Sequence, residues 1–236
     1  MRKGLSLRSA SEKNKIFESR RNTVSLEKGQ IKKVFSDAEA AQHEWNVLTL
    51  LQLRGVPVPE VLDLRENVLY LQYCPGPLLL DRVLELEEKN SAEGLYGLCA
   101  ELADWFNQFY QAVPGHIRGD VNFRNFIVGV SGITGIDFET LPIGQKETDM
   151  GNLLSYYAAY SPAFTTQRIK GAVIMLNAFS EKITLDKSKV LREMDFAFKR
   201  MEKRRKCFDV KRAERWLKGF EKCVVNHRFR EFLIQK

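Results

Sequence analysis

The chain has 236 residues, of which 44% are hydrophobic and 28% are charged, and its formal net charge is +7. This composition is ordinary for a folded globular protein and excludes a disordered chain, while the length suits one domain or two small lobes. No apolar run approaches the roughly 20 residues that cross a bilayer, and no apolar core follows the basic N-terminus, so we expect neither a membrane span nor a secretory signal.

The positive charge is concentrated in two blocks. Residues 1–36 hold ten Lys and Arg against three acidic residues, and residues 199–218 also hold ten against three. Such blocks could attract an anionic partner such as ATP, RNA or a membrane surface, although a solvated helix face is the simpler explanation of the second block. The cysteines form no C-x-x-C pair, which indicates reduced thiols in a cytoplasmic protein rather than a zinc site or a disulfide framework. They are Cys74, Cys99, Cys207 and Cys223.

The first third of the chain is rich in strand patterns. Alternating residues over 16–35 surround Lys28-Gly29 and predict a hairpin. Ser36 then suits the N-cap of a helix that Gly55 closes. The segments VLDLRE and NVLYLQYC predict two more strands, which end at Pro75-Gly76-Pro77.

The rest of the chain is mainly helical. Apolar residues recur at helical spacing over 91–112, and three further helical patterns cover about 162–180, 188–206 and 210–234. A loop-and-strand region over 114–140 interrupts the helices. The order predicts an α+β fold, with a small strand-rich lobe over residues 1–74 and a larger helical lobe over residues 75–236.

Three polar residues in this irregular region suggest a site for phosphoryl transfer. Asp120 lies five residues before Asn125, and Asp137 follows after twelve more. Phosphoryl transfer needs a carboxylate that orients the attacking hydroxyl and accepts its proton, and oxygen ligands that hold Mg²⁺ on the phosphates. Asp120 is the expected base, and Asn125 and Asp137 are the expected Mg²⁺ ligands. The apolar segments between the last two would form a short hairpin that brings them to the same end.

The segments R-G-D-V-N-F-R-N and I-D-F-E resemble the catalytic loop and the metal motif of the protein-kinase-like superfamily, and most of all its aminoglycoside phosphotransferase and choline/ethanolamine kinase branch. The resemblance implies a bilobal kinase-like fold and an ATP-dependent kinase that phosphorylates an alcohol group. That branch has a further Asp twelve residues after the metal motif, which matches Asp149 here. By this analogy Asp149 braces the catalytic loop through backbone amides.

The resemblance also implies a Lys on the third strand that holds the nucleotide phosphates, paired with a Glu on the following helix. The segment GQIKKVF is similar to that strand, and aligning its Ile selects Lys32, which leaves Lys33 on the opposite face. Glu44 lies at helical spacing from apolar residues, whereas Glu39 clusters with polar ones. Because a carboxylate on a buried face needs a partner, Glu44 is the expected partner of Lys32.

The strand over 68–76 resembles the last strand and hinge of the superfamily, where the adenine ring bonds the backbone. In that register Gln72 to Cys74 supply the hinge amides and carbonyls. An ordinary core strand that ends at a proline turn is an equally good interpretation.

The sequence departs from the family pattern in three places. Arg118 stands where a His normally supports the catalytic loop, and His116 does not restore the register, so we expect the Arg to reach a phosphate or a carboxylate instead. No glycine-rich loop joins the first strands, which would leave backbone amides or Arg20 and Arg21 to contact phosphates. The segment after Asp137 is too short for an activation loop, which argues against a peptide substrate.

The acceptor pocket is the least defined part of the prediction. Candidates are Glu139, Tyr156, Tyr157 and Tyr160, whose rings near acidic residues could hold a cationic amine or could simply pack a helix. The basic helices over 188–218 would instead favour an anionic acceptor such as a sugar phosphate or a lipopolysaccharide core.

The leading hypothesis is therefore a cytoplasmic phosphotransferase that uses ATP and Mg²⁺ and acts on the hydroxyl of a small molecule such as an amino alcohol, an aminoglycoside or a sugar. One alternative is a compact atypical protein kinase or ATPase that works in a complex through its basic helices. Another is a nucleotide-binding pseudokinase, although the complete set of site residues argues against it. Nucleic acid is not an expected partner because the chain has no recognisable binding module, and peripheral membrane contact through the basic helices is left open.

Overall fold

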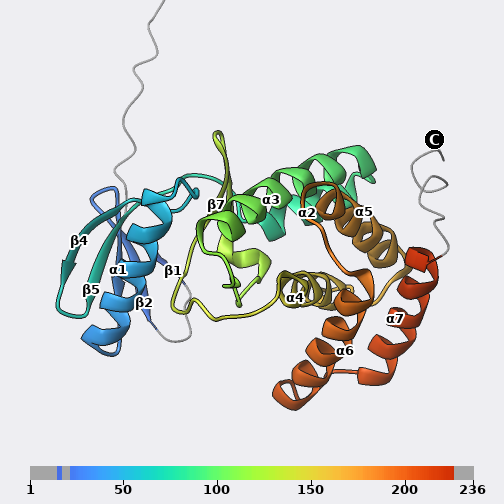
Figure 1. The fold of residues 1–236 in the computed structure, drawn as a ribbon. Helices are drawn as coiled ribbons and strands as arrows, with labels where there is room; N and C mark the ends of the chain where they lie inside the picture. Colours follow the sequence, from blue (N-terminus) through green and yellow to red (C-terminus); the bar gives the residue numbers. More distant parts are fainter. Residues whose placement is uncertain (1–14, 18–21, 226–236) are drawn as a thin grey trace, which may run out of the picture.

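The computed structural model describes residues 15–17 and 22–225, which form a five-stranded antiparallel sheet with one helix, followed by a larger helical part (Figure 1). Arg20 and Arg21, which the sequence offered as phosphate contacts, lie outside the described residues. The α+β architecture with a small sheet and a larger helical lobe confirms the predicted fold class. The strands are β1 (Lys15–Phe17), β2 (Thr23–Glu27), β3 (Gln30–Val34), β4 (Val61–Arg65), β5 (Val68–Gln72), β6 (Phe126–Gly129) and β7 (Gly132–Gly135). The helices are α1 (Ala38–Leu53), α2 (Leu79–Glu88), α3 (Ala92–Ala112), α4 (Lys146–Ala159), α5 (Thr166–Lys182), α6 (Lys187–Arg204) and α7 (Val210–Val225).

The sheet has the strand order β1-β2-β3-β5-β4, and every neighbouring pair is antiparallel. The predicted β2–β3 hairpin is confirmed, because Glu27 pairs with Gln30 and leaves Lys28 and Gly29 as a two-residue turn. Both turn residues have positive φ, 52° and 79°, which matches the twist of the flanking strands. The sheet thereby places β3 in its centre, between β2 and β5.

Helix α1 begins at Asp37, whose side chain accepts a hydrogen bond of 2.8 Å from the backbone N–H of Ala40. The prediction of Ser36 as the N-cap is wrong by one residue, because Ser36 instead donates to the carboxylate of Asp37. Gly55 follows the helix with φ of +76°, as expected of a residue that ends a helix. The buried face of α1 covers the sheet and contains one charged residue, Glu44.

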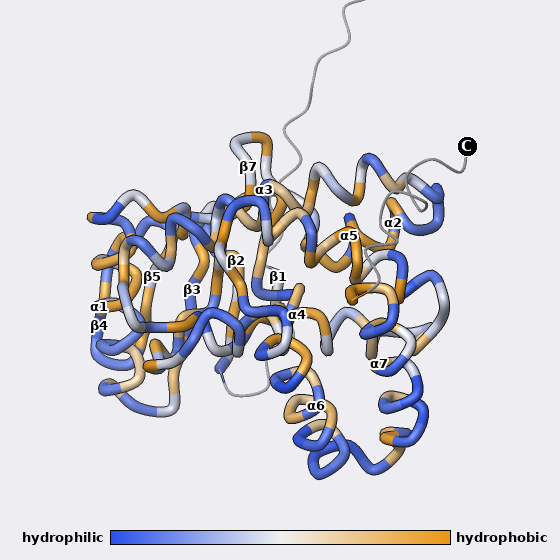
Figure 2. Tube along the Cα trace, turned by 45° about the vertical axis from the view of Figure 1, so that its right-hand side comes forward, coloured by the Kyte–Doolittle hydropathy of each residue, from blue (hydrophilic) through white to orange (hydrophobic). Residues whose placement is uncertain are grey.

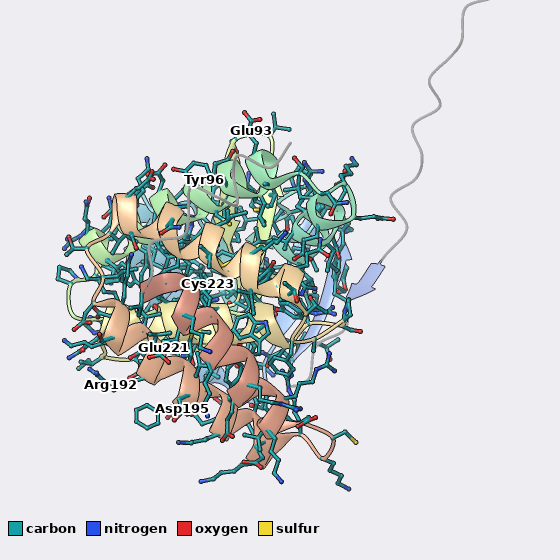
Figure 3. The ribbon with its side chains drawn as sticks, turned by 90° about the vertical axis from the view of Figure 1, so that its right-hand side faces the viewer. Glu93, Tyr96, Arg192, Asp195, Glu221 and Cys223 are labelled. Carbon is teal, nitrogen blue, oxygen red and sulfur yellow. The ribbon has the colours of Figure 1, made fainter. Side chains whose placement is uncertain are left out.

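The helical part packs around aromatic side chains of α3. Trp105 lies against the rings of Phe106, Phe109 and Phe126, with ring centroids 5.2 to 5.5 Å apart. The predicted helices over 91–112, 162–180, 188–206 and 210–234 correspond to α3, α5, α6 and the described part of α7. The sequence analysis did not predict helices α2 and α4. Figure 3 looks onto this end of the molecule, with α7, which carries Glu221 and Cys223, across the front.

Hydrophobic residues lie inside both parts, whereas the outer ends of α6 and α7 are mainly hydrophilic (Figure 2). In the part of the chain that the structure describes, no helix is both long and apolar enough to cross a lipid bilayer.

Candidate active site

The β6–β7 hairpin brings the catalytic-loop segment and the segment around Asp137 to the same place. Phe126 pairs with Gly135, and the backbone N–H of Ile136 donates to the carbonyl of Asn125 at 2.9 Å. Asn125, just before β6, and Asp137, just after β7, therefore lie at the same end of the hairpin. The predicted hairpin is confirmed.

Asp149, near the start of α4, braces the catalytic loop as the sequence suggested. Its carboxylate accepts hydrogen bonds from the backbone N–H groups of Arg118 (2.7 Å) and Gly119 (2.9 Å), and from the hydroxyl of Tyr110 (3.0 Å). Burial raises the pKa of Asp149 to about 6, although these hydrogen bonds favour the ionised form. The buried carboxylate fixes the backbone directly before Asp120.

Arg118 supports the site through backbone carbonyls. Its side chain is 1% exposed, and its Nη2 donates to the carbonyls of Ile136 (2.5 Å) and Asp137 (2.7 Å). The guanidinium also lies over the ring of Phe138, 4.1 Å from the ring centroid. The expectation that Arg118 reaches a phosphate or a carboxylate is wrong, because burial turns the side chain toward the segment that carries Asp137. His116 takes no part in this contact, and its Nδ1 lies 3.2 Å from the carbonyl oxygen of Pro114.

The catalytic loop is held together by short-range hydrogen bonds. The Asp120 carboxylate accepts from the backbone N–H of Asn122 at 3.3 Å, and the side-chain amide of Asn125 donates to the carbonyl of Asp120 at 3.2 Å. The side chain of Asp120 is exposed. The loop therefore presents one carboxylate to solvent beside a fixed amide.

The lysine that pairs with Glu44 is Lys33, and the prediction of Lys32 is wrong. Lys33 Nζ lies 2.6 Å from Glu44 Oε2, whereas Lys32 Nζ lies 3.6 Å from Glu27 at the partly exposed surface. On β3, Lys33 stands between its cross-strand neighbours Val24 and Leu69, on the face that α1 covers. Leu69 is fully buried and Val24 is partly buried. Aligning Ile31 with the Ile of the family's strand shifted the register by one residue. Such a shift selects Lys32 instead of Lys33, because successive side chains of a strand point to opposite faces of the sheet. The signal in the sequence is Phe35, a large apolar residue two positions after Lys33 and so on the same face.

Lys33 also contacts the carboxylates that follow the hairpin. Its Nζ lies 2.5 Å from Asp137 Oδ1 and 3.7 Å from Glu139 Oε1. Burial alone lowers the pKa of Lys33, but the charges of Glu44 and Asp137 outweigh it and hold the pKa above its ordinary value. Lys33 is therefore a buried ammonium ion that links the sheet, α1 and the helical part.

Two further contacts fix this junction. The backbone N–H of Phe138 donates to Glu44 Oε1 at 3.3 Å, and the side-chain amide of Asn22, just before β2, donates to Glu139 Oε1 at 2.6 Å. Asp137 itself adopts a positive φ of 66°, in the left-handed region that Asp tolerates better than most side chains. The segment that carries Asp137 is thus held from both lobes.

The predicted hinge, Gln72 to Cys74, lies where the sheet passes into the helical part. Gln72 ends β5, and its backbone N–H donates to the carbonyl of Glu60 at 2.9 Å. Burial raises the pKa of the Cys74 thiol. After it, Gly76 passes so close to β6 that a Cβ there would lie 2.5 Å from the carbonyl oxygen of Val128. The position agrees with a hinge, while nucleotide contact there stays a prediction.

The three tyrosines near the end of α4 have different surroundings. Tyr157 is buried, its hydroxyl donates to Glu87, and the guanidinium of Arg168 lies 4.7 Å from the centroid of its ring. Arg168 and Glu87 form a buried ion pair of 2.6 Å, so Tyr157 belongs to the helical core and not to an acceptor pocket. Tyr160 donates to the side-chain carbonyl of Asn122 at 2.9 Å and accepts from the N–H of Phe123. Tyr160 therefore supports the catalytic loop, a role that the sequence analysis missed.

The oxygen atoms available at this junction suit Mg²⁺ held together with phosphates. Within the described residues, no group of three or more His, Cys, Asp and Glu is arranged to hold a metal ion. Mg²⁺, however, is usually bound by one or two protein oxygen ligands together with substrate phosphates and water. Asn125 and Asp137, at one end of the β6–β7 hairpin, offer ligands of that type.

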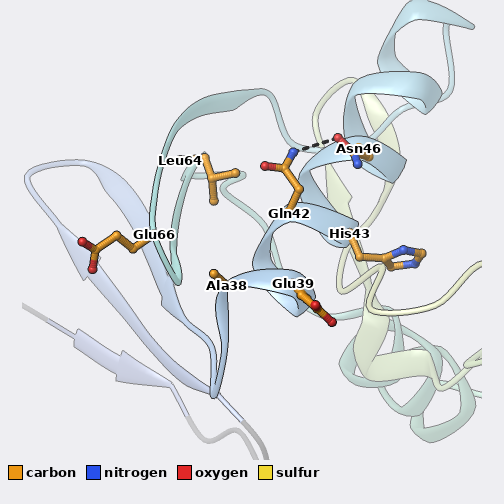
Figure 4. A pocket seen from close by; sticks show the side chains of 7 residues that line it. All are labelled: Ala38, Glu39, Gln42, His43, Asn46, Leu64 and Glu66. Atoms are coloured by element: carbon orange, nitrogen blue, oxygen red, sulfur yellow. Dashed lines mark hydrogen bonds between the residues drawn. The ribbon is translucent and has the colours of Figure 1, made fainter.

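A separate pocket of about 600 Å³ lies on the outer face of α1 and contains none of the predicted site residues (Figure 4). It is lined mainly by exposed polar side chains that include Glu39, Gln42, His43 and Asn46, while Glu44 is buried on the other face of the helix. The predicted clustering of Glu39 with these residues is confirmed, so Glu39 is not the partner of the β3 lysine.

The family model of the RIO domain matches residues 7–145, which is more than half of the chain. The chain belongs to the RIO domain family. No curated protein matches it in sequence. The RIO match covers the sheet, α1 and the segments around Asp120 and Asp137, and it supports the protein-kinase-like superfamily rather than the particular branch that the motifs resembled.

Solved structures with low sequence identity are similar in fold to this RIO protein. A choline/ethanolamine kinase family protein from Mesorhizobium loti has a TM-score of 0.51 and 11% identity, over 94% of this chain and 92% of that one. WaaP, in a complex with acyl carrier protein, has a TM-score of 0.54 and 13% identity, over 86% of this chain and 89% of that one. At these identities the comparison establishes the kinase-like fold.

Proposed function

We propose that this RIO domain protein is an ATP- and Mg²⁺-dependent phosphotransferase that transfers phosphate to the hydroxyl of a small molecule. The observation that carries the proposal is the convergence of Lys33, Glu44 and Asp137, because Nζ of Lys33 lies within 2.6 Å of both carboxylates. A buried ammonium ion paired with a helix carboxylate is the arrangement by which kinase folds hold nucleotide phosphates. We place the boundary between the two lobes at residues 74 and 75.

Asp120 acts on the acceptor in this proposal. Its exposed carboxylate orients the acceptor hydroxyl and accepts the hydroxyl proton as the oxygen attacks the γ-phosphorus of ATP. The bond between that phosphorus and the bridging oxygen of ADP breaks, and the products are ADP and a phosphate ester. Lys33 neutralises the negative charge of the α- and β-phosphates, and backbone groups of Gln72 to Cys74 bond the adenine.

Asn125 and Asp137 would hold Mg²⁺, which would neutralise charge on the phosphate oxygens. Without nucleotide, Lys33 compensates the charge of Asp137 at 2.5 Å. Arg118 and Asp149 act as positioning residues, because they hold the backbone of Asp137 and of the catalytic loop. Catalysis in this arrangement depends mostly on positioning and on charge neutralisation.

A second candidate is an atypical kinase or ATPase that acts within a complex. Membership of the RIO domain family favours it. The described chain passes from Asp137 to the start of α4 at Lys146 in few residues, which leaves no room for a long activation loop that would bind a peptide. This feature supports the small-molecule acceptor over a peptide.

The proposal is tested by thermal-shift titration of the wild-type protein with ATP, with Mg²⁺ and with both, alongside Asp137→Ala. A ligand that binds only the folded state raises the melting temperature by mass action. We expect stabilisation that needs both components and that disappears in Asp137→Ala. Asp63→Ala is the matched control, since Asp63 pairs with Arg65 at the surface of β4. Equal stabilisation of Asp137→Ala and the wild type would refute the assignment of the site.

A further inference from the structure

The end of α6 carries a concentration of positive charge. Arg200, Arg204 and Arg205 are all exposed. Among residues 15–17 and 22–225, no carboxylate forms an ion pair with any of the three. By contrast, Lys199 of the same helix pairs with Asp195 at 2.5 Å. The three arginines therefore leave uncompensated positive charge at one place.

Packing of α6 on α4 fixes where this charge lies. The backbone of Glu193 and Met194 lies directly against Gly151, and the hydroxyl of Ser155 lies 3.4 Å from the carbonyl of Met194. Farther along α6, Nη2 of Arg200 donates to the side-chain carbonyl of Asn152 on α4 at 2.6 Å. Arg200 is thus attached to α4, and the other two arginines lie one turn beyond it.

One face of α4 then leads from Arg200 to the catalytic loop. Asn152 and Tyr156 are spaced four residues apart and so lie on the same face of the helix, and Tyr160 directly follows its last residue. Tyr160, at the end of this row, donates to Asn122, two residues after Asp120. Eight residues of helix span about 12 Å, so the row is comparable in length to one or two sugar rings.

Tyr156 lies between the two ends of this row and within electrostatic range of both. Burial raises the pKa of its hydroxyl, the negative charge of Asp120 raises it further, and Arg204, Arg205 and Arg200 oppose the rise. The hydroxyl of Tyr156 therefore interacts electrostatically with both Asp120 and the basic end of α6. A cationic amine placed here would face uncompensated positive charge, whereas an anion would be attracted to it.

We propose that the acceptor is a hydroxyl compound of sugar size that carries a phosphate or a carboxylate, which Arg200, Arg204 and Arg205 bind while the hydroxyl faces Asp120. This inference rests on the proposed function and replaces the amino alcohol or aminoglycoside with an anionic acceptor. Guanidinium groups suit it because they bond phosphate and carboxylate oxygens in pairs. The required chemistry occurs in a free sugar phosphate and in the headgroup of phosphatidylglycerol.

The test uses the full chain with bound Mg²⁺ and a non-hydrolysable ATP analogue. The probes are glucose, glucosamine and glucose 6-phosphate, which share a ring and differ in charge, and vesicles of phosphatidylcholine with or without phosphatidylglycerol. Ligand-observed NMR and vesicle sedimentation report binding. The variant is R200Q/R204Q/R205Q, and the matched control is K211Q/R212Q/R215Q, which removes the same charge from exposed positions of α7.

We expect glucose 6-phosphate or the phosphatidylglycerol vesicles to bind in preference to the neutral and cationic probes. Whichever of these two anionic probes binds identifies the source of the anion. Binding should weaken by about tenfold or more in the α6 variant, and much less in the α7 control, and it should weaken with salt. Preference for glucosamine, equal binding of the three sugars, no binding of either anionic probe, or equal losses in both variants would overturn the inference. Competition by poly-glutamate but not by glucose 6-phosphate would also overturn it and would identify a surface for acidic proteins.

The nucleotide titration separates this inference from the proposed function. Loss of Mg²⁺-dependent nucleotide binding in the wild type would refute the phosphotransferase itself. Normal nucleotide binding in both triple variants, together with no preference for anions, would refute only the anionic acceptor.

Discussion

Replacing Lys33 with Met should separate the two neighbouring lysines of β3 more sharply than any other single change. Met keeps most of the length and the apolar volume of the side chain but removes the ammonium that contacts Glu44 and Asp137. Lys33→Met should abolish Mg²⁺-ATP stabilisation and should also destabilise the protein. Lys32→Met is the matched control, because Nζ of Lys32 lies 3.6 Å from the partly exposed Glu27 and not beside Glu44 or Asp137.

The loss of stability can be estimated from the surroundings of Glu44. Glu44 is 1% exposed, and burial already raises its pKa although Lys33 opposes the rise. Without Lys33 the cheapest response of the carboxyl group is to take up a proton, and at pH 7 protonation of a Glu costs about 3 kcal/mol relative to the unfolded chain. The exposed pair of Lys32 contributes about 0.5 kcal/mol.

Because the loss of stability comes from protonation of Glu44, the effect of Lys33→Met should depend on pH. The folded variant holds its proton on Glu44 above the ordinary pKa of 4.5, so its penalty is small near pH 4 and grows as the pH rises toward 7. Urea unfolding at several pH values between 4 and 7.5, followed by circular dichroism, measures the difference from wild type. The double variant Lys33→Met/Glu44→Gln should recover most of the stability at pH 7 and should still fail to bind the nucleotide.

Two results would refute the reasoning. Retention of nucleotide binding by Lys33→Met together with its loss in Lys32→Met would show that the ion pair of β3 and α1 is structural and that the phosphates bind on the other face. A penalty for Lys33→Met that does not change between pH 4 and 7 would show that the loss of stability does not come from an unpaired Glu44.

Three further changes test the rest of the site. Asp120→Asn should lower the rate of phosphate transfer by a factor of about 10² to 10⁴ and leave nucleotide stabilisation intact. A radiometric transfer assay and thermal shift measure the two effects, and an undiminished transfer rate would exclude Asp120 as the base. Arg118→Met should weaken Mg²⁺-dependent nucleotide binding, because the carbonyls of Ile136 and Asp137 lose their hydrogen-bond donor. Arg118→His should keep part of this binding, and titration with Mg²⁺ compares the two variants. Because Asp149 has a folded pKa of about 6 against an ordinary 3.8, its contribution to the unfolding free energy is present below pH 4 and falls by about 3 kcal/mol as the pH rises above 6. Asp149→Asn should lack this slope in urea unfolding, and parallel curves would contradict the raised pKa.

Much of the site could be predicted because its members are close in sequence. The spacing of Asp120, Asn125 and Asp137, with a short apolar hairpin between the last two, specifies which groups meet at one end of that hairpin. Asp149 lies a fixed distance further on, and it forms the backbone hydrogen bonds that the motif implies. These relations depend on local geometry, which a sequence pattern carries directly.

The contacts of Lys33 and Arg118 could not be found in the same way. Alternation on β3 separates Lys32 from Lys33, but it does not say which face α1 covers. That choice comes from the burial of Phe35 and Leu69 on one side of the sheet.

The sequence by itself therefore determined the α+β fold class, the kinase-like motifs and the meeting of Asn125 and Asp137 at one end of a hairpin. Tertiary packing alone decided which lysine is buried against Glu44, that Arg118 turns inward to backbone carbonyls, and that Arg200 reaches Asn152 across 48 positions of the chain. The physical reason is that burial and charge compensation are properties of facing surfaces, which come together only when α1 covers the sheet and α6 packs on α4.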